Sequence, residues 1–363
     1  MNVLCPAFPV RPLDPMDARA RRWYGVPVAE RLRAADDLIA ENEPLDALEM
    51  LTELNRKHPD PDIEERLVLL RRDAFSALEQ SEGRASWPPE FEDPFEGIDG
   101  LIEIKAPDLS LEVLGGAVRH HGHLLVRGLL PQAMVDRLVD AIDRAFAAQD
   151  AHKQGAPASE TAPWFVPIPS HPRYPTAPFG TEHTFSNRVL VVDSPRALFE
   201  IAEVFGEIGI DRLVGDYLGD RPVMAENKWA LWRMDSQVGS FTPWHQEISV
   251  YQSGPLRTLN LWLTLSACGE NAPGFQFLPQ RMDSIIEPEV SFGFGSETLA
   301  GVADMSKIVS PIYEPGDAIF FDEYLVHRTQ VRPDMLELRR FIESWMFAPA
   351  GHPLREQLGP LVL

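Results

Sequence analysis

Three residues in this sequence have the types and spacing of a mononuclear metal site. His245 and Glu247 are separated by one residue, and on a β-strand such residues point to the same face, so both side chains are expected to enter one cavity. The spacing alone is not specific, because His58-Pro59-Asp60 shares it and lies in an expected turn between helices, where we assign it no function. His327 supplies a third ligand, 82 residues after His245. Two imidazoles and one carboxylate that leave other coordination positions open make the facial site of non-haem Fe(II) and O2 chemistry.

Two arginines follow the third ligand at the start of an apolar strand expected over 339–347. A buried arginine aimed into the interior would hold a dicarboxylate through a two-pronged pair of hydrogen bonds. Arg339 and Arg340 lie twelve and thirteen residues after His327, and their spacing leaves both open for this role.

The elements that must position these residues are mostly short strands. Beyond residue 221 the pattern favours β segments separated by Pro and Gly turns, which is typical of a sandwich, a barrel or a jelly roll. Upstream of them we expect a short strand within 118–128 and a helix over 131–147. We therefore expect a mainly β fold with helices, a double-stranded β-helix that is the jelly roll of cupin-like proteins. Its expected segments are 223–234, 243–252, 258–266, 273–279, 307–313, 317–321 and 339–347.

The first quarter of the chain is helical in pattern. Apolar residues recur every three or four positions over 28–80, and Pro44 is expected to open a second helix at its first turn. Helix, short turn, helix and a Pro-rich turn resemble a tetratricopeptide-type (TPR-like) unit, in an array too short to bury its own apolar face. We expect this segment to pack on the rest of the chain, with a protein partner as the alternative. The expected domains are a helical segment at 1–90, a linker at 91–106 and the jelly roll at 107–363.

Composition excludes several classes of function. The 33 Lys and Arg residues against 55 Asp and Glu residues give a formal charge of −22, which argues against binding to nucleic acid or to an anionic membrane. Two cysteines provide neither a disulfide framework nor a four-cysteine zinc site. The N-terminal residues do not have the pattern of a signal peptide, and no uncharged stretch approaches the roughly 20 apolar residues that span a membrane. We expect a soluble, cytoplasmic protein.

In their order along the chain, the motifs between about residues 110 and 349 resemble the phytanoyl-CoA dioxygenase family of Fe(II)- and 2-oxoglutarate-dependent oxygenases. The stretches that carry the resemblance are His121–Leu129, Thr242–Glu247, Glu270–Pro279, Pro315–Asp317 and Arg339–Ile342. The resemblance implies an enzyme that uses Fe(II), 2-oxoglutarate and O2 to hydroxylate a small or mid-sized organic molecule, with release of succinate and CO2.

The resemblance also assigns roles to individual residues. It makes His245, Glu247 and His327 the iron ligands. Arg339 matches the arginine that pairs with the far carboxylate of 2-oxoglutarate. Arg340 is its rival, because Arg339 lies one residue further from the histidine than the family pattern has it. The other co-substrate contacts that the resemblance implies are Thr329, Trp262, Trp229 and Arg188.

Glu247 departs from the family pattern, in which an aspartate usually stands at this position. A small shift of the strand would absorb the extra methylene group. Halogenating relatives carry a small residue in place of the acid, so the presence of the Glu247 carboxylate favours hydroxylation.

Three further side chains are candidates for contact with a substrate. Residues 155–180 carry seven prolines interleaved with aromatic residues that include Trp164, a composition that favours an active-site lid. His183 follows that segment, where an ordinary loop histidine is the alternative. Tyr251 lies at even spacing from His245 and is expected to enter the cavity, with a core position as the alternative.

A different class of function stays open at this point. A non-catalytic jelly roll would bind a protein through its helical N-terminal segment and would need neither a buried arginine nor an open coordination site. The substrate itself is not indicated, although the net charge of −22 does not favour a coenzyme A thioester.

Overall fold

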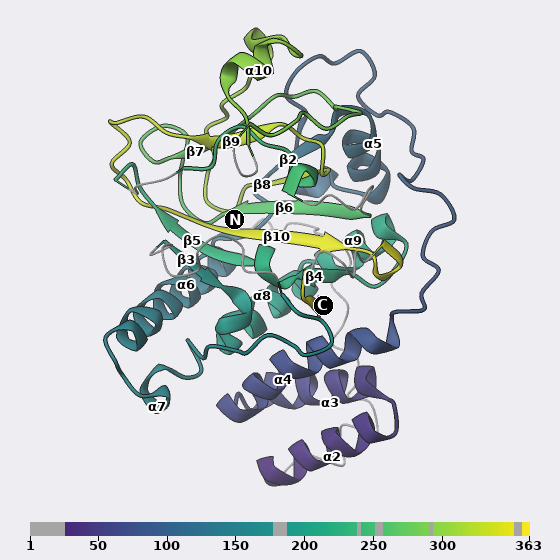
Figure 1. The fold of residues 1–363 in the computed structure, drawn as a ribbon, viewed down its shortest axis with the longest axis vertical. Coiled ribbons are helices and arrows are strands. Elements are labelled where there is room, and N and C mark those ends of the chain that lie inside the picture. The colour runs from purple at the N-terminus through teal and green to yellow at the C-terminus, as the bar shows by residue number, and fades with distance from the viewer. Residues whose placement is uncertain (1–25, 177–186, 238–240, 251–256, 290–292, 352–357) are drawn as a thin grey trace, which may run out of the picture.

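The computed structural model describes residues 26–176, 187–237, 241–250, 257–289, 293–351 and 358–363. A large β-sheet crosses the middle of the molecule, and the three helices of the N-terminal segment lie stacked at one end of it (Figure 1). The prediction of a mixed fold of β-sheet and helices is confirmed.

The central strand of the large sheet is β10 (Arg339–Phe347). It pairs antiparallel with β6 (Thr258–Thr264) along one edge, and with β5 (Ala230–Met234) and β4 (Val223–Ala225) along the other. Within the described residues the sheet has nine strands. The others are β8 (Ala318–Phe321), β2 (His123–Arg127) and β1 (Glu103–Lys105) beyond β6, β3 (Arg188–Leu190) beyond β5, and β11 (Pro360–Val362) beyond β4.

A smaller antiparallel pair, β7 (Gly274–Phe277) and β9 (His327–Gln330), faces the large sheet. Isolated bridges extend this second layer, from His245 to His327 on one side and from Phe277 to Val309 on the other. One buried cluster joins the two layers, with side chains from both sheets: Leu125, Trp262, Ile319, Phe321, Phe341, Phe275 and Phe277. Two facing sheets with a filled interior are the arrangement expected of a jelly roll.

Helices cover the other face of the large sheet. They are α5 (Leu111–His121), α6 (Gln132–Lys153), α8 (Pro195–Glu207) and α9 (Ile210–Leu218), with the short helices α7 (Ala158–Thr161) and α10 (Ser296–Ala300) elsewhere in the chain. Because successive residues of a strand point to opposite faces, Leu261, Phe320 and Ile342 pack against these helices while their neighbours point between the sheets. None of the helices in the described ranges combines the length and the apolar character that crossing a bilayer requires.

The N-terminal segment forms α2 (Val28–Ala40), α3 (Pro44–Lys57) and α4 (Pro61–Asp73), followed by a 3₁₀ turn over Ala74–Ala77. Pro44 and Pro61 stand in the first turns of α3 and α4, and the Asp60 side chain accepts hydrogen bonds from the first amides of α4. The helices share a buried cluster with the end of the large sheet, including Trp345 and Phe347. The segment therefore packs on its own chain, as expected, whereas its likeness to a TPR unit stays a prediction.

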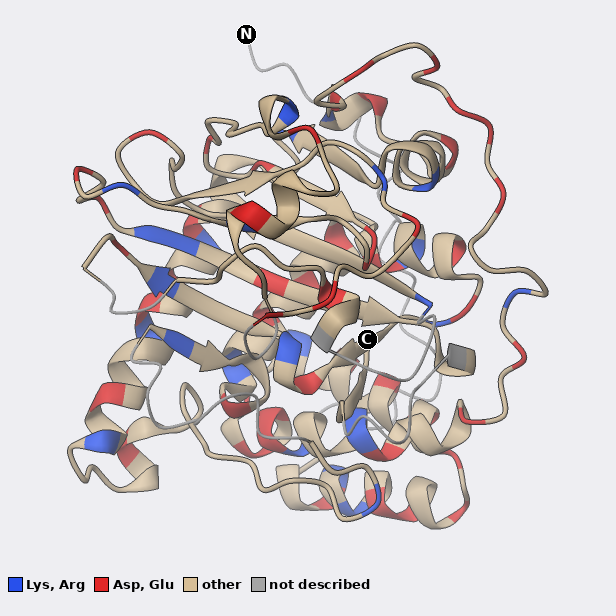
Figure 2. Cartoon of the chain, turned by 45° about the horizontal axis from the view of Figure 1, so that its top comes forward, with Lys and Arg blue, Asp and Glu red and all other residues tan. Residues whose placement is uncertain are grey.

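The segment between α4 and α5 crosses the side of the molecule as a long irregular stretch marked by acidic residues (Figure 2). It is anchored along its length, because the rings of Trp87 and Phe91 lie 5.8 and 6.2 Å from the ring of Tyr217 on α9. Strand β1 lies inside the predicted linker at 91–106 and pairs in parallel with β2. The linker is thus an attached part of the fold.

Four sequence expectations about elements need correction. The stretch 223–234 is not one strand, because a 3₁₀ turn over Glu226–Lys228 separates β4 from β5. The short strand expected within 118–128 is present as β2, which begins after α5 has continued to His121 and Gly122, with φ of +78°, has ended that helix. Helix α6 runs on to Lys153, beyond the expected end at residue 147. Neither 243–252 nor 307–313 is a continuous strand: the first turns at Glu247, and the second contributes only isolated bridges.

Candidate metal centre

His245, Glu247 and His327 converge in the interior between the two sheets. Each offers one ligand atom, these atoms all lie within 4.8 Å of one another, and the three residues are buried. The Oε1 atom of Glu247 is 3.4 Å from Nε2 of His245 and 3.5 Å from Nε2 of His327. The donor set predicted from residues far apart in the sequence is therefore assembled.

The backbone explains why the two histidines meet. His245 and His327 form an antiparallel bridge in which the amide of each donates a hydrogen bond to the carbonyl of the other, at 3.0 and 3.1 Å. Their ring centroids are 4.0 Å apart. The two residues thus occupy facing positions on neighbouring segments, which places both side chains on the same face of this layer.

Glu247 reaches the same point by a different route from the one expected. The chain leaves the extended conformation after Gln246 and enters a 3₁₀ turn over Glu247–Val250. The Gln246 side chain fixes this turn: its amide donates to the carbonyls of Ser284 and Tyr324, and its oxygen accepts from the amide of Ile286. Glu247 therefore reaches the two histidines because hydrogen bonds fix the turn in which it lies, and not because side chains alternate along a regular strand.

The hydrogen bonds of the two imidazoles indicate which nitrogen faces the centre. Nδ1 of His245 lies 2.9 Å from the carbonyl oxygen of Pro243, and Nδ1 of His327 lies 2.9 Å from that of Leu325. A carbonyl only accepts, so each Nδ1 carries the proton and each Nε2 presents its lone pair to the centre. Burial, together with the neighbouring His245, lowers the pKa of His327, which keeps that ring neutral and available as a ligand.

Two charged residues that the sequence reasoning missed complete the surroundings of Glu247. Nζ of Lys228 donates to Oε2 of Glu247 at 2.9 Å and lies 3.9 Å from Oε1 of Glu343. Burial alone would raise the pKa of Glu247, but the charge of Lys228 and the contacts with the two imidazoles outweigh it and hold that pKa well below its usual value. Glu343 could have indicated a nearby cation, because a carboxylate in the middle of a largely apolar strand needs a partner.

Arg339 lies buried in the same interior among aromatic side chains. Its guanidinium is 4.2 Å from the ring of Phe341 and 5.5 Å from that of Trp262, and it donates to the carbonyl of Gly274 at 2.7 Å. Its Nε has no hydrogen-bond partner, and no carboxylate of the described residues pairs with it. Burial lowers its pKa to about 10, so it stays charged at neutral pH and fits an anionic ligand.

The two neighbouring arginines have opposite surroundings. Arg340 points to the helix face, where it makes a two-pronged ion pair with Asp143 of α6 at 2.8 and 3.1 Å. Alternation along β10 therefore leaves Arg339 as the arginine of the interior.

Two of the predicted co-substrate contacts lie next to Arg339 and the metal ligands. Trp262 packs against Phe275 (5.3 Å between ring centroids), which in turn stacks on His327 at 4.9 Å. Thr329 is two residues beyond His327 on β9 and pairs with Phe275, so it shares the face of His327. A continuous group of side chains thus leads from the metal ligands to Arg339.

The other two predicted contacts have different positions. Trp229 is fully buried in the cluster between the sheet and the helices, because it follows Lys228 and points to the opposite side, so the structure does not bring it to the metal ligands. Arg188 lies on β3 over the ring of Trp232, whose Nε1 donates to Glu343 at 2.9 Å. Arg188 therefore borders the interior near Lys228.

Of the three predicted substrate contacts, only one can be located. Trp164 lies among helices, with the guanidinium groups of Arg144 on α6 and Arg196 on α8 at 5.1 and 5.8 Å from its ring. It packs against the helix-face core, so it is not brought together with the metal ligands. His183 and Tyr251 lie outside the described residues.

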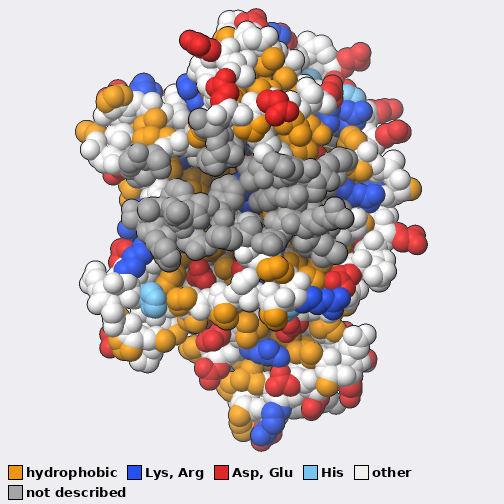
Figure 3. Space-filling view, in the orientation of Figure 1, with side chains coloured by type: hydrophobic (Ala, Val, Ile, Leu, Met, Phe, Trp, Pro, Cys, Tyr) orange, Lys and Arg blue, Asp and Glu red, His pale blue; other side chains and the backbone are white. Residues whose placement is uncertain are grey.

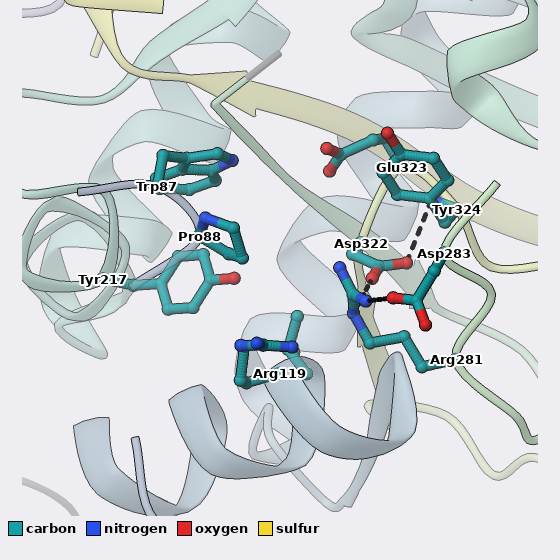
Figure 4. A pocket seen from close by; sticks show the side chains of 10 residues that line it. Trp87, Pro88, Arg119, Tyr217, Arg281, Asp283, Asp322, Glu323 and Tyr324 are labelled. Atoms are coloured by element: carbon teal, nitrogen blue, oxygen red, sulfur yellow. Dashed lines mark hydrogen bonds and ion pairs between the residues drawn. The ribbon is translucent and has the colours of Figure 1, made fainter. Parts of the chain in front are cut away.

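A separate cavity of about 120 Å³ borders residues 322–324, the segment that leads from β8 to His327 (Figure 4). Trp87 and Tyr217 form one wall, with the Tyr217 hydroxyl pointing inward, and Arg281 faces them across the cavity. None of the three candidate metal ligands lines it.

Two buried carboxyl groups form the floor of this cavity. Burial raises the pKa of Asp322 to about 7 and that of Glu323 to about 8, and the charge of Arg281 only partly offsets the first shift. The backbone carbonyl of Glu323 accepts a hydrogen bond of 3.0 Å from the amide of Ile248. The floor therefore supports the turn that carries Glu247.

The described side chains on the face drawn in Figure 3 do not favour a polyanionic partner. On the face drawn in Figure 3, the described Lys and Arg side chains are scattered among acidic and apolar ones and do not form a continuous patch. This distribution agrees with the net charge of −22.

Comparison with solved structures shows the fold. The structure of EctD from S. alaskensis with bound Fe matches with a TM-score of 0.51 and 16% identity, over 76% of this chain and 87% of that chain. The EctD structure with 2-oxoglutarate and 5-hydroxyectoine matches with a TM-score of 0.50 and 17% identity, over 74% and 86%. AviO1 from Streptomyces viridochromogenes Tue57 matches with a TM-score of 0.42 and 18% identity, over 65% and 94%.

No curated protein matches the sequence. The family model described as phytanoyl-CoA dioxygenase (PhyH) matches residues 118–331, which is more than half of the chain and includes all three candidate metal ligands. The chain therefore belongs to the phytanoyl-CoA dioxygenase family of Fe(II)- and 2-oxoglutarate-dependent oxygenases.

Proposed function

We propose that this enzyme hydroxylates a C–H bond of a small or mid-sized organic molecule while 2-oxoglutarate is converted to succinate and CO2. The observation that carries the proposal is the convergence of His245, Glu247 and His327 on one point in a buried interior. Two imidazoles and one carboxylate are the donor set that suits Fe(II) and leaves positions open for other ligands.

The three residues would hold the metal through Nε2 of each histidine and Oε1 of Glu247, the atoms that face one another. When bound, the ferrous ion, O2 and 2-oxoglutarate together supply the oxidising chemistry. The aromatic side chains between the sheets exclude water from the site, and the Nδ1 hydrogen bonds to backbone carbonyls keep both imidazole rings oriented.

Arg339 would hold the far carboxylate of 2-oxoglutarate. Its unpartnered Nε and its position among Trp262 and Phe341 support this role, as does the pairing of Arg340 with Asp143, which engages the rival arginine on the helix face. Thr329 and Trp262 would flank the co-substrate between Arg339 and the metal, and Arg188 would border the opposite end of the site.

Hydroxylation is the outcome that the ligand set supports. With a metal bound, the Glu247 carboxylate would take the place that a halide needs, and Lys228 orients that carboxylate through its hydrogen bond to Oε2. The EctD structure with 2-oxoglutarate and 5-hydroxyectoine contains a hydroxylated small molecule in a related fold. A role as a non-catalytic binding module has no comparable support, and a cytoplasmic location and a protein partner for the N-terminal helices stay predictions.

Addition of Fe(II) and 2-oxoglutarate without oxygen tests the proposal. The native protein is expected to develop the weak visible charge-transfer band of the ternary complex, and Glu247→Ala is expected to weaken or shift it. Arg339→Ala is expected to require much more 2-oxoglutarate for the same band. Arg340→Ala is the matched control, because that side chain points to the helix face, and it should leave the 2-oxoglutarate requirement unchanged.

A native protein that stays colourless, and that releases no succinate in air with any candidate substrate, would contradict the proposal. Equal effects of the Arg339 and Arg340 substitutions would contradict the assignment of the 2-oxoglutarate site.

A further inference from the structure

The two oxygens of the Glu247 carboxylate have different partners. Oε1 faces Nε2 of both histidines, at 3.4 and 3.5 Å. Oε2 instead accepts a hydrogen bond from Nζ of Lys228 at 2.9 Å. The chain's own residues thus orient the carboxylate, with one oxygen toward the ligand cluster and the other toward a cation.

Lys228 is itself fixed from the opposite side. It lies at the end of a 3₁₀ turn over Glu226–Lys228, is buried, and stands between Glu247 and Glu343. Glu343 is held in turn by Nε1 of Trp232 at 2.9 Å. The ammonium group of Lys228 therefore has a carboxylate on each side, and it can only donate hydrogen bonds to them.

We propose that Lys228 is a positioning residue that keeps Glu247 a ligand through Oε1 alone. If Oε2 also reached the metal, it would fill a coordination position that O2 or 2-oxoglutarate needs. The proposal rests on the proposed function, since it assumes that the cluster binds a metal. It also accounts for a glutamate at this position, because a side chain one methylene longer than aspartate has an additional torsion to restrain.

The experiment uses Co(II) as the probe, since its visible d–d spectrum reports coordination number without turnover. Lys228→Met keeps the length and the apolar stem but removes the charge and the donors. We expect it to change the Co(II) spectrum in the direction of a higher coordination number and to weaken Co(II) binding about tenfold, as loss of an outer partner of a ligand commonly does. Lys228→Arg is expected to restore the native spectrum, because it retains a charged donor.

Arg340→Met is the matched control. It removes the charge of an ion pair with Asp143 on the helix face of the sheet and leaves the contact between Lys228 and Glu247, so the native Co(II) spectrum is expected. If Lys228→Met does not fold, Lys228→Leu takes its place, since it also lacks the charge and the donors.

A double-mutant cycle distinguishes positioning from general damage. In the Glu247→Asp background the carboxylate is withdrawn from Lys228, so Lys228→Met is expected to change Co(II) affinity there by no more than about twofold. An equal loss in both backgrounds would overturn the proposal, as would an unchanged spectrum and affinity for Lys228→Met in the native background. A native protein that binds neither Co(II) nor Fe(II) would instead overturn the proposed function, and this proposal with it.

Discussion

The two faces of the large sheet bury different chemistry, although the same strands supply both. On β10, Ile342 and Met346 point to the helices and join an apolar cluster. Arg339, which is buried, and Glu343, which is partly buried, are charged residues on the opposite face. The helix face stabilises the fold through apolar burial, whereas the interior face retains groups that cost stability unless they are paired.

The largest expected effect concerns the interior face. His327→Ala removes one of the two imidazoles, and succinate release is expected to fall by more than the roughly 10–100-fold that loss of an outer partner costs. The thermal unfolding midpoint of the metal-free protein is expected to remain close to the native value, because the substitution leaves the helix-face core intact. A variant whose unfolding midpoint falls sharply while its succinate release stays at the native rate would contradict this contrast between the two faces.

The helix face should show the opposite behaviour. Ile342→Ala leaves a cavity against the helices and is expected to lower the free energy of unfolding by about 2–5 kcal/mol. Denaturant unfolding measures this loss. Titration of the folded variant with Co(II) is expected to give the native affinity, and a large loss of affinity would show that the two faces are coupled.

The paired carboxyls at the end of β8 predict a pH dependence of stability. Because burial raises the pKa of Asp322 to about 7 and that of Glu323 to about 8, above the values of about 4 in an unfolded chain, the folded state binds more protons across this interval. Their contribution is therefore full below about pH 4 and is lost as the pH rises to about 8.

Calorimetry between pH 5 and 8 tests this dependence. The unfolding midpoint is expected to fall with rising pH in the native protein and to change less in the double variant Asp322→Asn and Glu323→Gln. Parallel curves for the two proteins would contradict the assignment of the pKa shifts to this pair.

The smallest effect is expected at the N-terminal helices. Arg56 of α3 pairs with Glu203 of α8 at the surface, where an ion pair contributes about 0.2–1 kcal/mol. Arg56→Ala should therefore change the free energy of unfolding by no more than that, since the buried contacts of Trp345 and Phe347 fix these helices. A loss of several kcal/mol would show that ion pairs, and not buried apolar contacts, attach these helices to the rest of the chain.

The sequence was informative where chemistry depends on residue type and less so where it depends on local direction. The convergence of His245, Glu247 and His327 could be predicted because their types and order suffice, whereas the spacing left Arg339 and Arg340 both open. Apolar spacing was enough for α2, α3, α4, α6 and β10, but it did not indicate α5, α8 or α9. Alternation from His245 onward failed, because the Gln246 side chain makes three hydrogen bonds that turn the chain.

That Lys228 faces the metal ligands, while Trp229 lies in the helix-face core, has a similar cause. A 3₁₀ turn over Glu226–Lys228 precedes β5 and sets which residue points inward, and that residue is Lys228. Nothing in the spacing of apolar residues reports such a turn. The charge of Glu343 within β10 was the available clue that a buried cation had to be nearby.

The reciprocal hydrogen bonds between His245 and His327 make the two ligands one unit of the backbone. Neither segment can move away without breaking both bonds, so opening of this part of the fold releases both imidazoles in a single event. Loading with metal should consequently slow the hydrogen–deuterium exchange of these two amides by the same factor, which makes them paired reporters of occupancy.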